Sequence, residues 1–241
     1  MSADVSLLKK TIGKPVLDPY ERLFGRIVGY HTDKKGKVLK IGVERSNGEI
    51  LSYPHSQFLV KNGSVIFIYS WKIRSEDFIK RFNVVSQKIW ALDKLYERGE
   101  ISQSYYESNR EQFEKSINDI MEYGKKLLKQ LICKKDKLTT QINDLEKHLV
   151  SVKMQHVTGE LGENGYKSVN EALRVGLEKT TLEKNDVENV INIMKNTPQI
   201  PTMQQIKAKS SEAHSSTSSL TLHLEDDDET LTKTFKEAIE H

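Results

Sequence analysis

Short runs of β-branched and aromatic residues, separated by turn signals, fill residues 7–73. The runs read IGKPV, LFGRIVGY, KVLKIGVE, EILSY and SVIFIY, and the turns between them contain Asp18-Pro19, Lys35-Gly36, Asn47-Gly48 and Asn62-Gly63. We expect Asn47-Gly48 to form a type I′ hairpin turn, which needs positive φ at both residues. Five or six strands in so short a segment must curl to cover their apolar face, so the pattern predicts a small barrel.

The pattern changes to a helical period at Ser75, which we expect to cap the first helix. Its apolar stripe is Phe78, Phe82, Val85, Ile89, Leu92 and Leu95. These spacings of three and four residues predict one amphipathic helix that ends at Gly99.

A much longer apolar stripe follows, and Ser102 is the expected cap of its helix. The stripe contains Phe113, Ile117, Ile120, Gly124, Leu127, Leu131, Lys134, Leu138, Ile142, Leu145, Leu149 and Val152. A helix over 102–155 spans roughly 80 Å at 1.5 Å per residue, which no small domain buries alone. Helix 78–98 or a second copy of the chain is therefore needed to cover part of this stripe.

Three glycines within 158–165 predict a turn after this helix. A capping box at Ser168 predicts the start of a returning helix, with a break at Asn185-Asp186 and an end at Asn196. The two helices together predict an antiparallel coiled-coil hairpin.

The end of the chain has two different patterns. Residues 197–218 are rich in Ser and poor in apolar residues, which is typical of a disordered linker. Residues 219–241 alternate Leu220, Leu222 and Leu224 as in a strand, and then place Leu231, Phe235 and Ile239 at helical spacing. A strand and helix this short do not bury their apolar faces alone, so we interpret them as a partner-binding peptide. The alternative is that this strand packs on an edge of the chain's own sheet.

The pattern as a whole predicts an α+β protein. We expect a β-barrel at 1–74, a helical hairpin at 75–196, a flexible linker at 197–218 and a partner-binding peptide at 219–241.

Charge is unevenly distributed along these parts. Residues 1–81 hold 15 Lys and Arg against 8 Asp and Glu, whereas residues 201–241 hold 4 against 8. A basic head favours phosphates as partners and an acidic tail favours a basic protein surface. The single cysteine, Cys133, excludes an internal disulfide, and we find no signal peptide or membrane-spanning run. These features indicate a cytoplasmic protein.

Motifs for catalysis are absent from the sequence. It contains no phosphate-binding glycine loop, no dinucleotide fingerprint and no H-E-x-x-H pair, and its seven histidines have no ligand spacing. We therefore predict a protein that is not an enzyme and that uses no metal and no cofactor.

Two basic clusters are candidate binding surfaces. The candidates for phosphate or nucleic acid in the head are Lys9, Lys10, Lys14, Arg26, Lys34, Lys35, Lys37 and Lys40. Lysine-rich turns also serve solubility and edge protection in small barrels, which is the alternative. The second cluster, on the long helix, is Lys125, Lys126, Lys129, Lys134, Lys135 and Lys137. It faces anionic lipid or DNA, or it is a solvated face, or it pairs with Glu178, Glu183, Asp186 and Glu188 on the returning helix.

The first 70 residues resemble the PRC-barrel family. The resemblance lies in IGKPVLDPYERLFGRIVGY, then KVLKIGVE and a closing SVIFIY, with Gly25 and Gly29 in the second strand. PRC barrels serve RNA processing, photosynthesis and archaeal division, so the resemblance implies a fold and leaves the function open.

The order of parts resembles the CdvA family of archaeal cell-division proteins over nearly the whole chain. This resemblance implies a filament-forming scaffold at the division site, near membrane and nucleoid. It also implies association with DNA and with membrane, and recruitment of the ESCRT-III homologue CdvB. By pattern, Leu220, Leu222 and Leu224 would form the strand added to the winged-helix domain of CdvB, with Leu231, Phe235 and Ile239 as helix anchors. The alternative function is a nucleoid- or RNA-associated barrel protein that uses its basic head.

Overall fold

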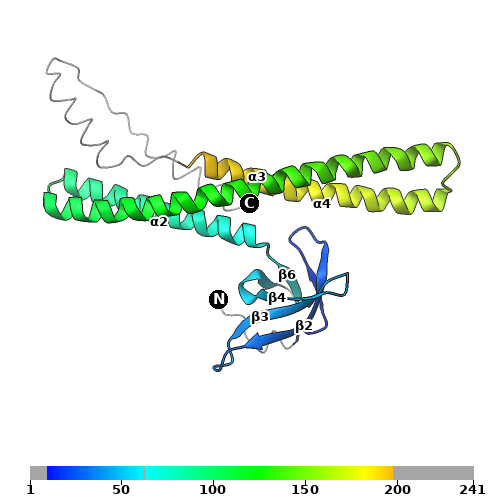
Figure 1. The fold of residues 1–241 in the computed structure, drawn as a ribbon, viewed down its shortest axis with the longest axis horizontal. Coiled ribbons are helices and arrows are strands. Elements are labelled where there is room, and N and C mark those ends of the chain that lie inside the picture. Colours follow the sequence, from blue (N-terminus) through cyan, green and yellow to red (C-terminus); the bar gives the residue numbers. More distant parts are fainter. Residues whose placement is uncertain (1–9, 62, 198–241) are drawn as a thin grey trace, which may run out of the picture. The chain divides into compact units, whose positions relative to one another are not determined.

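The computed structural model describes residues 10–61 and 63–197, and it confirms the α+β class (Figure 1). The strands are β1 Pro15–Leu17, β2 Leu23–Thr32, β3 Val38–Glu44, β4 Ile50–Pro54, β5 Phe58–Lys61 and β6 Ser64–Phe67, with a 3-10 turn η1 at His55–Gln57. The helices are α2 Ser70–Glu97, α3 Gln103–Val157 and α4 Glu163–Lys195. Residues 219–241, including the six predicted anchors, lie outside the described residues, as does Lys9.

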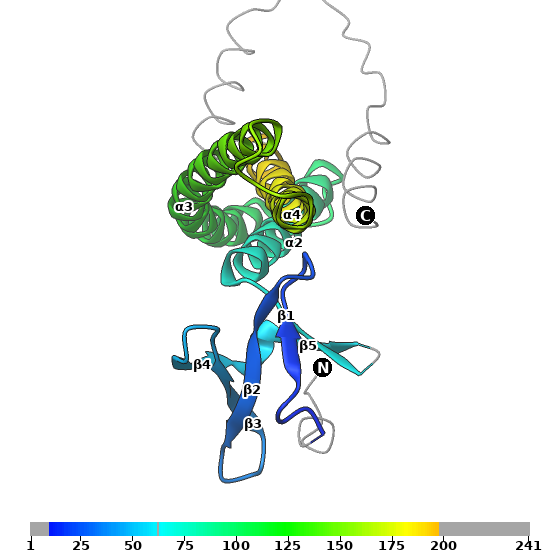
Figure 2. The same ribbon diagram turned by 90° about the vertical axis from the view of Figure 1, so that its right-hand side faces the viewer.

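The six strands form one sheet in the order β4-β3-β2-β1-β6-β5. Neighbouring strands are antiparallel except β1 and β6, which pair in parallel through Val16 with Val65 and Leu17 with Ile66. The end strands β4 and β5 are joined through η1 but share no ladder in the part of the chain described, so the expected barrel is an open, strongly bent sheet (Figure 2).

The hairpin turn at Asn47-Gly48 is present, but its type differs from the prediction. Only Gly48 has positive φ, at 81°, and its N–H donates to the carbonyl of Arg45 at 2.9 Å. This is a type I turn followed by one left-handed glycine, which suits a three-residue loop. Gly36 closes the β2–β3 turn in the same way, with its N–H on the carbonyl of Asp33 at 3.0 Å.

The sheet encloses a core of its own on its concave face. The buried side chains are Val16, Phe24, Ile27, Val38, Ile41, Val43, Val65 and Phe67. Phe24 stacks on Phe67 with ring centroids 3.8 Å apart. Gly25 is required beside this core, because a Cβ there would lie 2.3 Å from the carbonyl oxygen of Glu44.

The first helix begins earlier than the sequence pattern indicated. α2 starts at Ser70, and Ser75 lies inside it as a buried residue whose hydroxyl donates to the carbonyl of Trp71 at 2.7 Å. The predicted cap at Ser75 is therefore wrong, since a serine satisfied by its own helix does not signal a helix start. The end near Gly99 is confirmed, with φ of 69° at that glycine.

The antiparallel hairpin is formed by α3 and α4. Ser102 caps α3 as expected, and its side chain accepts from the N–H of Tyr105 at 3.3 Å. α4 runs unbroken through Asn185-Asp186 and begins at Glu163, so the predicted break and the predicted start at Ser168 are both wrong. One polar pair does not interrupt a helix whose apolar face is packed.

The helices bury a second core only over part of their length. α2 packs on α3, and with α4 they enclose Trp71, Phe78, Phe82, Ile117, Ile120, Leu127, Leu131, Leu138, Val187, Ile191 and Met194. Gly124 allows the close contact, because a Cβ there would lie 2.4 Å from the ring of Phe78. Helix α2 therefore covers the near half of the long stripe within one chain.

Beyond this core the hairpin has two helices only. We call residues 139–179 the distal arm, which contains the end of α3, the turn and the first half of α4. No residue of the distal arm is buried. Its stripe residues Ile142, Leu145, Leu149, Leu173 and Leu177 remain partly exposed.

Candidate functional site

The basic residues of the sheet divide into two groups. Arg26 binds the carboxylate of Glu44 with two hydrogen bonds, at 2.6 and 3.1 Å, and Lys14 donates to the carbonyl of Gly63 at 3.3 Å. These two residues already have partners within the sheet, which weakens them as ligands for phosphate. Lys10 is exposed just before β1.

The other lysines gather at the β2–β3 turn. Lys34, Lys35, Lys37 and Lys40 are all exposed. The carboxylate of Asp33 accepts the backbone N–H groups of Lys35 and Lys37, each at 2.8 Å, and so organises the turn. Among residues 10–61 and 63–197, no carboxylate lies within ion-pair distance of these four ammonium groups. The turn is therefore a compact cationic projection.

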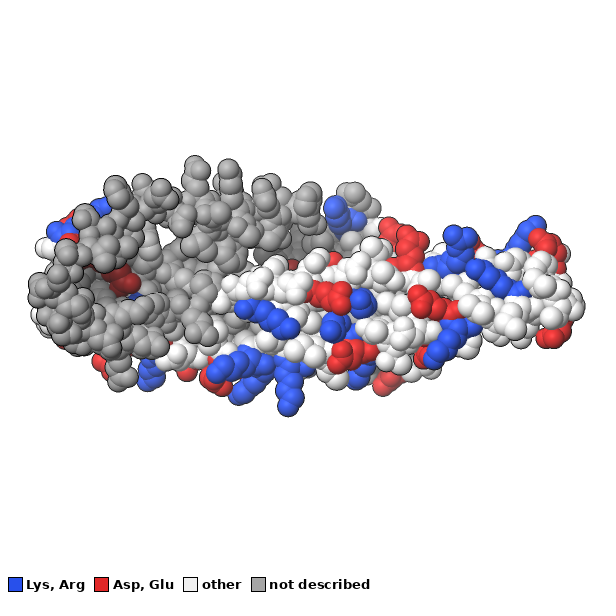
Figure 3. Space-filling view, turned by 90° about the horizontal axis from the view of Figure 1, so that it is seen from above, with Lys and Arg blue, Asp and Glu red and all other residues white. Residues whose placement is uncertain are grey.

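Helix α3 carries the second cluster, and Figure 3 shows blue groups gathered along one edge of the helices. Lys125, Lys126, Lys129 and Lys137 are exposed on the side of α3 away from the core. Lys125 binds Glu122 of the same helix at 2.6 Å, which lowers the pKa of that glutamate.

Of the predicted pairs with the returning helix, one forms among the described residues: Lys134 with Glu183. Glu188 instead binds Lys184 of its own helix at 3.1 Å, and Asp186 binds Lys72 of α2 at 2.8 Å. Lys134 therefore pairs with α4 and is not part of the exposed lysine surface of α3.

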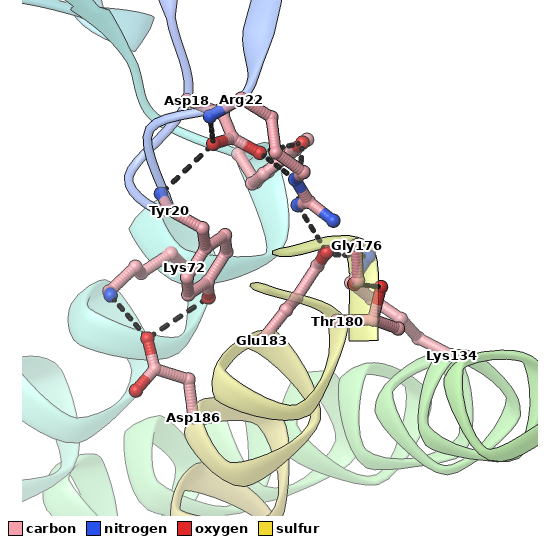
Figure 4. A network of polar contacts seen from close by, with 10 residues as sticks. Asp18, Tyr20, Arg22, Lys72, Lys134, Gly176, Thr180, Glu183 and Asp186 are labelled. Carbon is pink, nitrogen blue, oxygen red and sulfur yellow. Dashed lines mark hydrogen bonds and ion pairs between the residues drawn. The ribbon is translucent and has the colours of Figure 1, made fainter. Parts of the chain in front are cut away.

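A network of polar contacts that includes this pair joins the β1–β2 turn to the helices, and we call it the junction (Figure 4). Its residues are Asp18, Tyr20, Arg22, Tyr69, Lys72, Lys134, Glu183 and Asp186. They come from the sheet, from the start of α2, from the middle of α3 and from α4.

Asp18 organises the sheet side of the junction. Its carboxylate is almost fully buried and accepts the N–H groups of Tyr20 and Arg22, at 2.9 and 2.8 Å. It also accepts the guanidinium of Arg22 at 2.6 Å and the hydroxyl of Tyr69 at 2.9 Å. Glu21, between Tyr20 and Arg22 in the sequence, has a φ of 60°. Its carbonyl accepts a hydrogen bond from the ammonium of Lys179 in α4 at 2.9 Å. The strained turn is thus held from both sides.

Glu183 is the centre of the helix side. Its side chain is 4% exposed and lies between two cations, Arg22 of the sheet and Lys134 of α3. The Lys134 ammonium is 2.6 Å from Glu183 and also lies over the rings of Tyr69 and Trp71, at 5.2 and 5.9 Å. A buried carboxylate needs such partners, because a lone buried charge is very costly.

Asp186, one helical turn further on, binds a second pair of groups. It accepts the hydroxyl of Tyr20 at 3.0 Å and the ammonium of Lys72 at 2.8 Å. Its side chain is 39% exposed, so this contact is better solvated than that of Glu183. Asp186, which the sequence pattern suggested as a helix break, instead helps fix the sheet to α2 and α4.

The electrostatics of the junction keep its tyrosines neutral. Burial, followed by the charge of Asp186 and its hydrogen bond, raises the pKa of Tyr20 far above the usual value. Burial and then Asp18 act in the same direction on the pKa of Tyr69. Arg22 keeps its proton, because its hydrogen bonds to Glu183 and Asp18 outweigh burial and raise its pKa. Tyr20, Tyr69 and Arg22 therefore keep their protons near neutral pH.

Sequence reasoning included one contact of the junction, the pair of Lys134 with Glu183, among its alternatives and missed the others. A signal for them was Glu183 itself, a charged residue at an apolar position between Thr180 and Val187 in the stripe of α4. Its partner Arg22 lies 161 residues away, and no local pattern connects the two.

Other kinds of site were sought in the same residues. Over 10–61 and 63–197, no group of three or more His, Cys, Asp or Glu side chains is arranged to hold a metal ion. The described helices also include none that is both long enough and apolar enough to span a bilayer.

Comparison with known proteins gives two matches. The family model of the CdvA-like coiled-coil domain matches residues 70–219. Cell division protein A of Sulfolobus acidocaldarius is 28% identical over 193 residues, which cover 80% of this chain and 80% of that protein. The matched region includes the whole of α2, α3 and α4.

Proposed function

Because this chain belongs to the CdvA-like coiled-coil family, we propose that it is a non-enzymatic, filament-forming scaffold of archaeal cell division. In this proposal it acts at the division site, associates with DNA and/or membrane, and recruits the ESCRT-III homologue CdvB through residues 219–241. The family match carries the proposal, and the name of the Sulfolobus relative, cell division protein A, supports the division role.

The fold suits a scaffold in two ways. The junction fixes the sheet on the helices through ion pairs of the buried Glu183, so contacts made by either part act on one connected body. The distal arm keeps its apolar stripe partly exposed, which provides surface for contacts between copies. Once copies assemble, a weak peptide on each gains strength by multivalency, since effective concentration replaces intrinsic affinity.

Recruitment is assigned to the tail from its sequence pattern. In an added strand, the alternating pattern would put Leu220, Leu222 and Leu224 on one face and Thr221 and His223 on the other. Binding to an exposed sheet edge gains main-chain hydrogen bonds from the strand and specificity from alternate side chains.

The experiment pellets assemblies of the full chain with the winged-helix domain of CdvB and measures how much of that domain co-sediments. Deleting 219–241 should abolish co-sedimentation and leave the pelleted fraction of the chain unchanged. Leu222→Asp should lose most of the partner, and the matched control Thr221→Asp should retain it, because the two residues occupy opposite faces. Full recruitment by the deleted chain would refute the tail assignment.

The cationic β2–β3 turn favours a second candidate function, binding of nucleic acid by the sheet. Its four lysines are exposed and lack carboxylate partners among the described residues, as a phosphate site requires. Binding of this kind weakens steeply with salt, by about 0.9 in log-log slope for each phosphate neutralised on duplex DNA.

Fluorescence anisotropy of labelled duplex DNA, titrated with the full chain at several salt concentrations, tests this candidate. Replacing Lys34, Lys35, Lys37 and Lys40 with Ala should reduce the slope by about 3 to 4, if each lysine contacts one phosphate. Lys147→Ala, on an exposed lysine already paired with Asp144, is the control. An unchanged slope in the quadruple variant would exclude the turn as the contact.

A further inference from the structure

The distal arm contains a groove between its two helices. The groove has a volume of about 600 Å³, and Leu149 of α3 and Leu177 of α4 contribute apolar side chains to it. Lys153, Arg174 and Glu178 line it as well. Its apolar residues are partly exposed, unlike those of the core shared with α2, so the groove is an uncovered continuation of the same stripe.

Charge differs between the two ends of this groove. The side chain of Leu145 packs against Gly176, and its Cδ2 lies 3.8 Å from where a Cβ on Gly176 would be. This contact shows the register of α3 against α4. In this register Lys153 lies about ten helical residues closer to the turn than Glu178, or about 15 Å along the arm. The groove therefore has a lysine toward its tip and a glutamate toward its base, with Arg174 between them.

The two ends of this groove are complementary in charge when a second copy is reversed, whereas the Arg174 residues of the two copies lie near the middle and have the same sign. Rotating a second copy by a two-fold axis through the middle of the groove reverses its direction and brings the Lys153 end of each copy over the Glu178 end of the other. A two-fold contact needs this kind of self-complementary patch. The apolar residues of both grooves would then be buried as a four-helix bundle, the usual solution for two helical hairpins.

We infer that the groove of the distal arm binds the same groove of a second copy in antiparallel orientation, so that two chains join arm to arm. This inference deepens the proposed scaffold role and rests on it, because it names the surface through which copies first pair. Charge complementarity between the two ends sets the direction of pairing, and burial of Leu149 and Leu177 contributes to the driving force.

A charge-exchange series tests the inference, with the dissociation constant of self-association measured by sedimentation velocity on the full chain. Lys153→Glu and Glu178→Lys should each weaken pairing at least tenfold, because each places like charges opposite one another. The double variant should return to within about threefold of the original, since the exchanged pair is again opposite in sign. Circular dichroism melting checks that each variant keeps its helices.

Lys147→Glu is the matched control, because it makes the same charge change on the same helix but lies outside the groove and is paired with Asp144. It should leave the dissociation constant unchanged. If the double variant pairs no better than the single variants, or if both single variants pair normally, the inference is overturned.

The chain without 219–241 provides a second test of the occupant. It should pair with the same dissociation constant, and loss of pairing would make the tail the occupant of the groove and overturn the inference. If groove variants form filaments normally, the arm-to-arm inference is overturned and the proposed scaffold function is not affected. If the original chain stays monomeric at all concentrations, both the arm-to-arm inference and the proposed scaffold function are overturned.

Discussion

The two halves of the helical hairpin have the same apolar period but different burial. Up to Leu138 the stripe of α3 is covered by α2 and α4, and Leu127 and Leu131 are at most 2% exposed. Beyond it, Leu145 and Leu149 occupy equivalent positions in the stripe and remain partly exposed, because only α4 is there to cover them. A period of three and four residues thus predicts a helix face, and the number of neighbouring helices decides whether that face is buried.

Truncation of one leucine in each half measures this difference and should give the largest effect. Leu131→Ala leaves a cavity in a closed core and should lower the free energy of unfolding by about 4 kcal/mol, within the usual range of about 2–5 kcal/mol. Leu145→Ala removes the same atoms from a partly exposed site and should cost less than half as much. Urea unfolding followed by circular dichroism at dilutions where the chain is monomeric measures both.

The same pair of variants sharpens the arm-to-arm inference. At high protein concentration, pairing would bury the distal stripe, so the cost of Leu145→Ala should rise toward that of Leu131→Ala. Equal costs under dilute conditions would contradict the contrast between the halves.

The junction offers a second comparison, between its two carboxylates. Glu183→Gln removes a charge that is 4% exposed, leaves Lys134 without its counter-ion and leaves Arg22 with Asp18 alone, so unfolding should become easier by about 3 kcal/mol. Asp186→Asn makes the same change at a side chain that is 39% exposed and should cost less than about 1 kcal/mol. Thermal unfolding of the two variants in parallel measures the difference, and similar losses would mean that burial does not separate them.

The sequence predicted the helices and strands better than the contacts between them. Turn glycines and β-branched runs located the sheet, and the long stripe located α3, because these signals are local. The junction depends on Arg22 meeting Glu183, a contact between chain segments far apart in sequence. Ser75 and Ser168 were wrongly predicted to start helices, and Asp186 was wrongly predicted to break one. The same residue types also occur inside a packed helix, where their side chains find hydrogen-bond partners.

The coverage of the stripe was also left open by the sequence. Either helix 78–98 or a second copy fits the pattern, since any amphipathic helix satisfies an apolar face. The packing of Phe78 against Gly124 shows that α2 covers the near half, because only a glycine admits that ring. The distal arm has no such contact with α2. Its apolar period is the same as that of the near half, so the period alone does not distinguish the two.

The smallest expected effect is a difference in the titration of Tyr20 between the folded and the unfolded chain. The pKa of Tyr20 is raised above its ordinary 10.0 by burial and by Asp186, so this side chain remains protonated when exposed tyrosines ionise. At pH 10.5, Tyr20→Phe should leave the tyrosinate absorbance near 295 nm unchanged. In the unfolded chain at the same pH, where burial and Asp186 no longer raise the pKa of Tyr20, the same substitution should reduce this absorbance.

The sign of the linked stability follows from the direction of this shift. A pKa raised in the folded state contributes stability that is fully present below the unfolded value of 10.0 and is lost as the pH rises above it. The gap in unfolding free energy between the original chain and Tyr20→Phe should therefore be constant up to about pH 9 and shrink above pH 10. A gap that stays constant above pH 10 would contradict a raised pKa of Tyr20 in the folded chain.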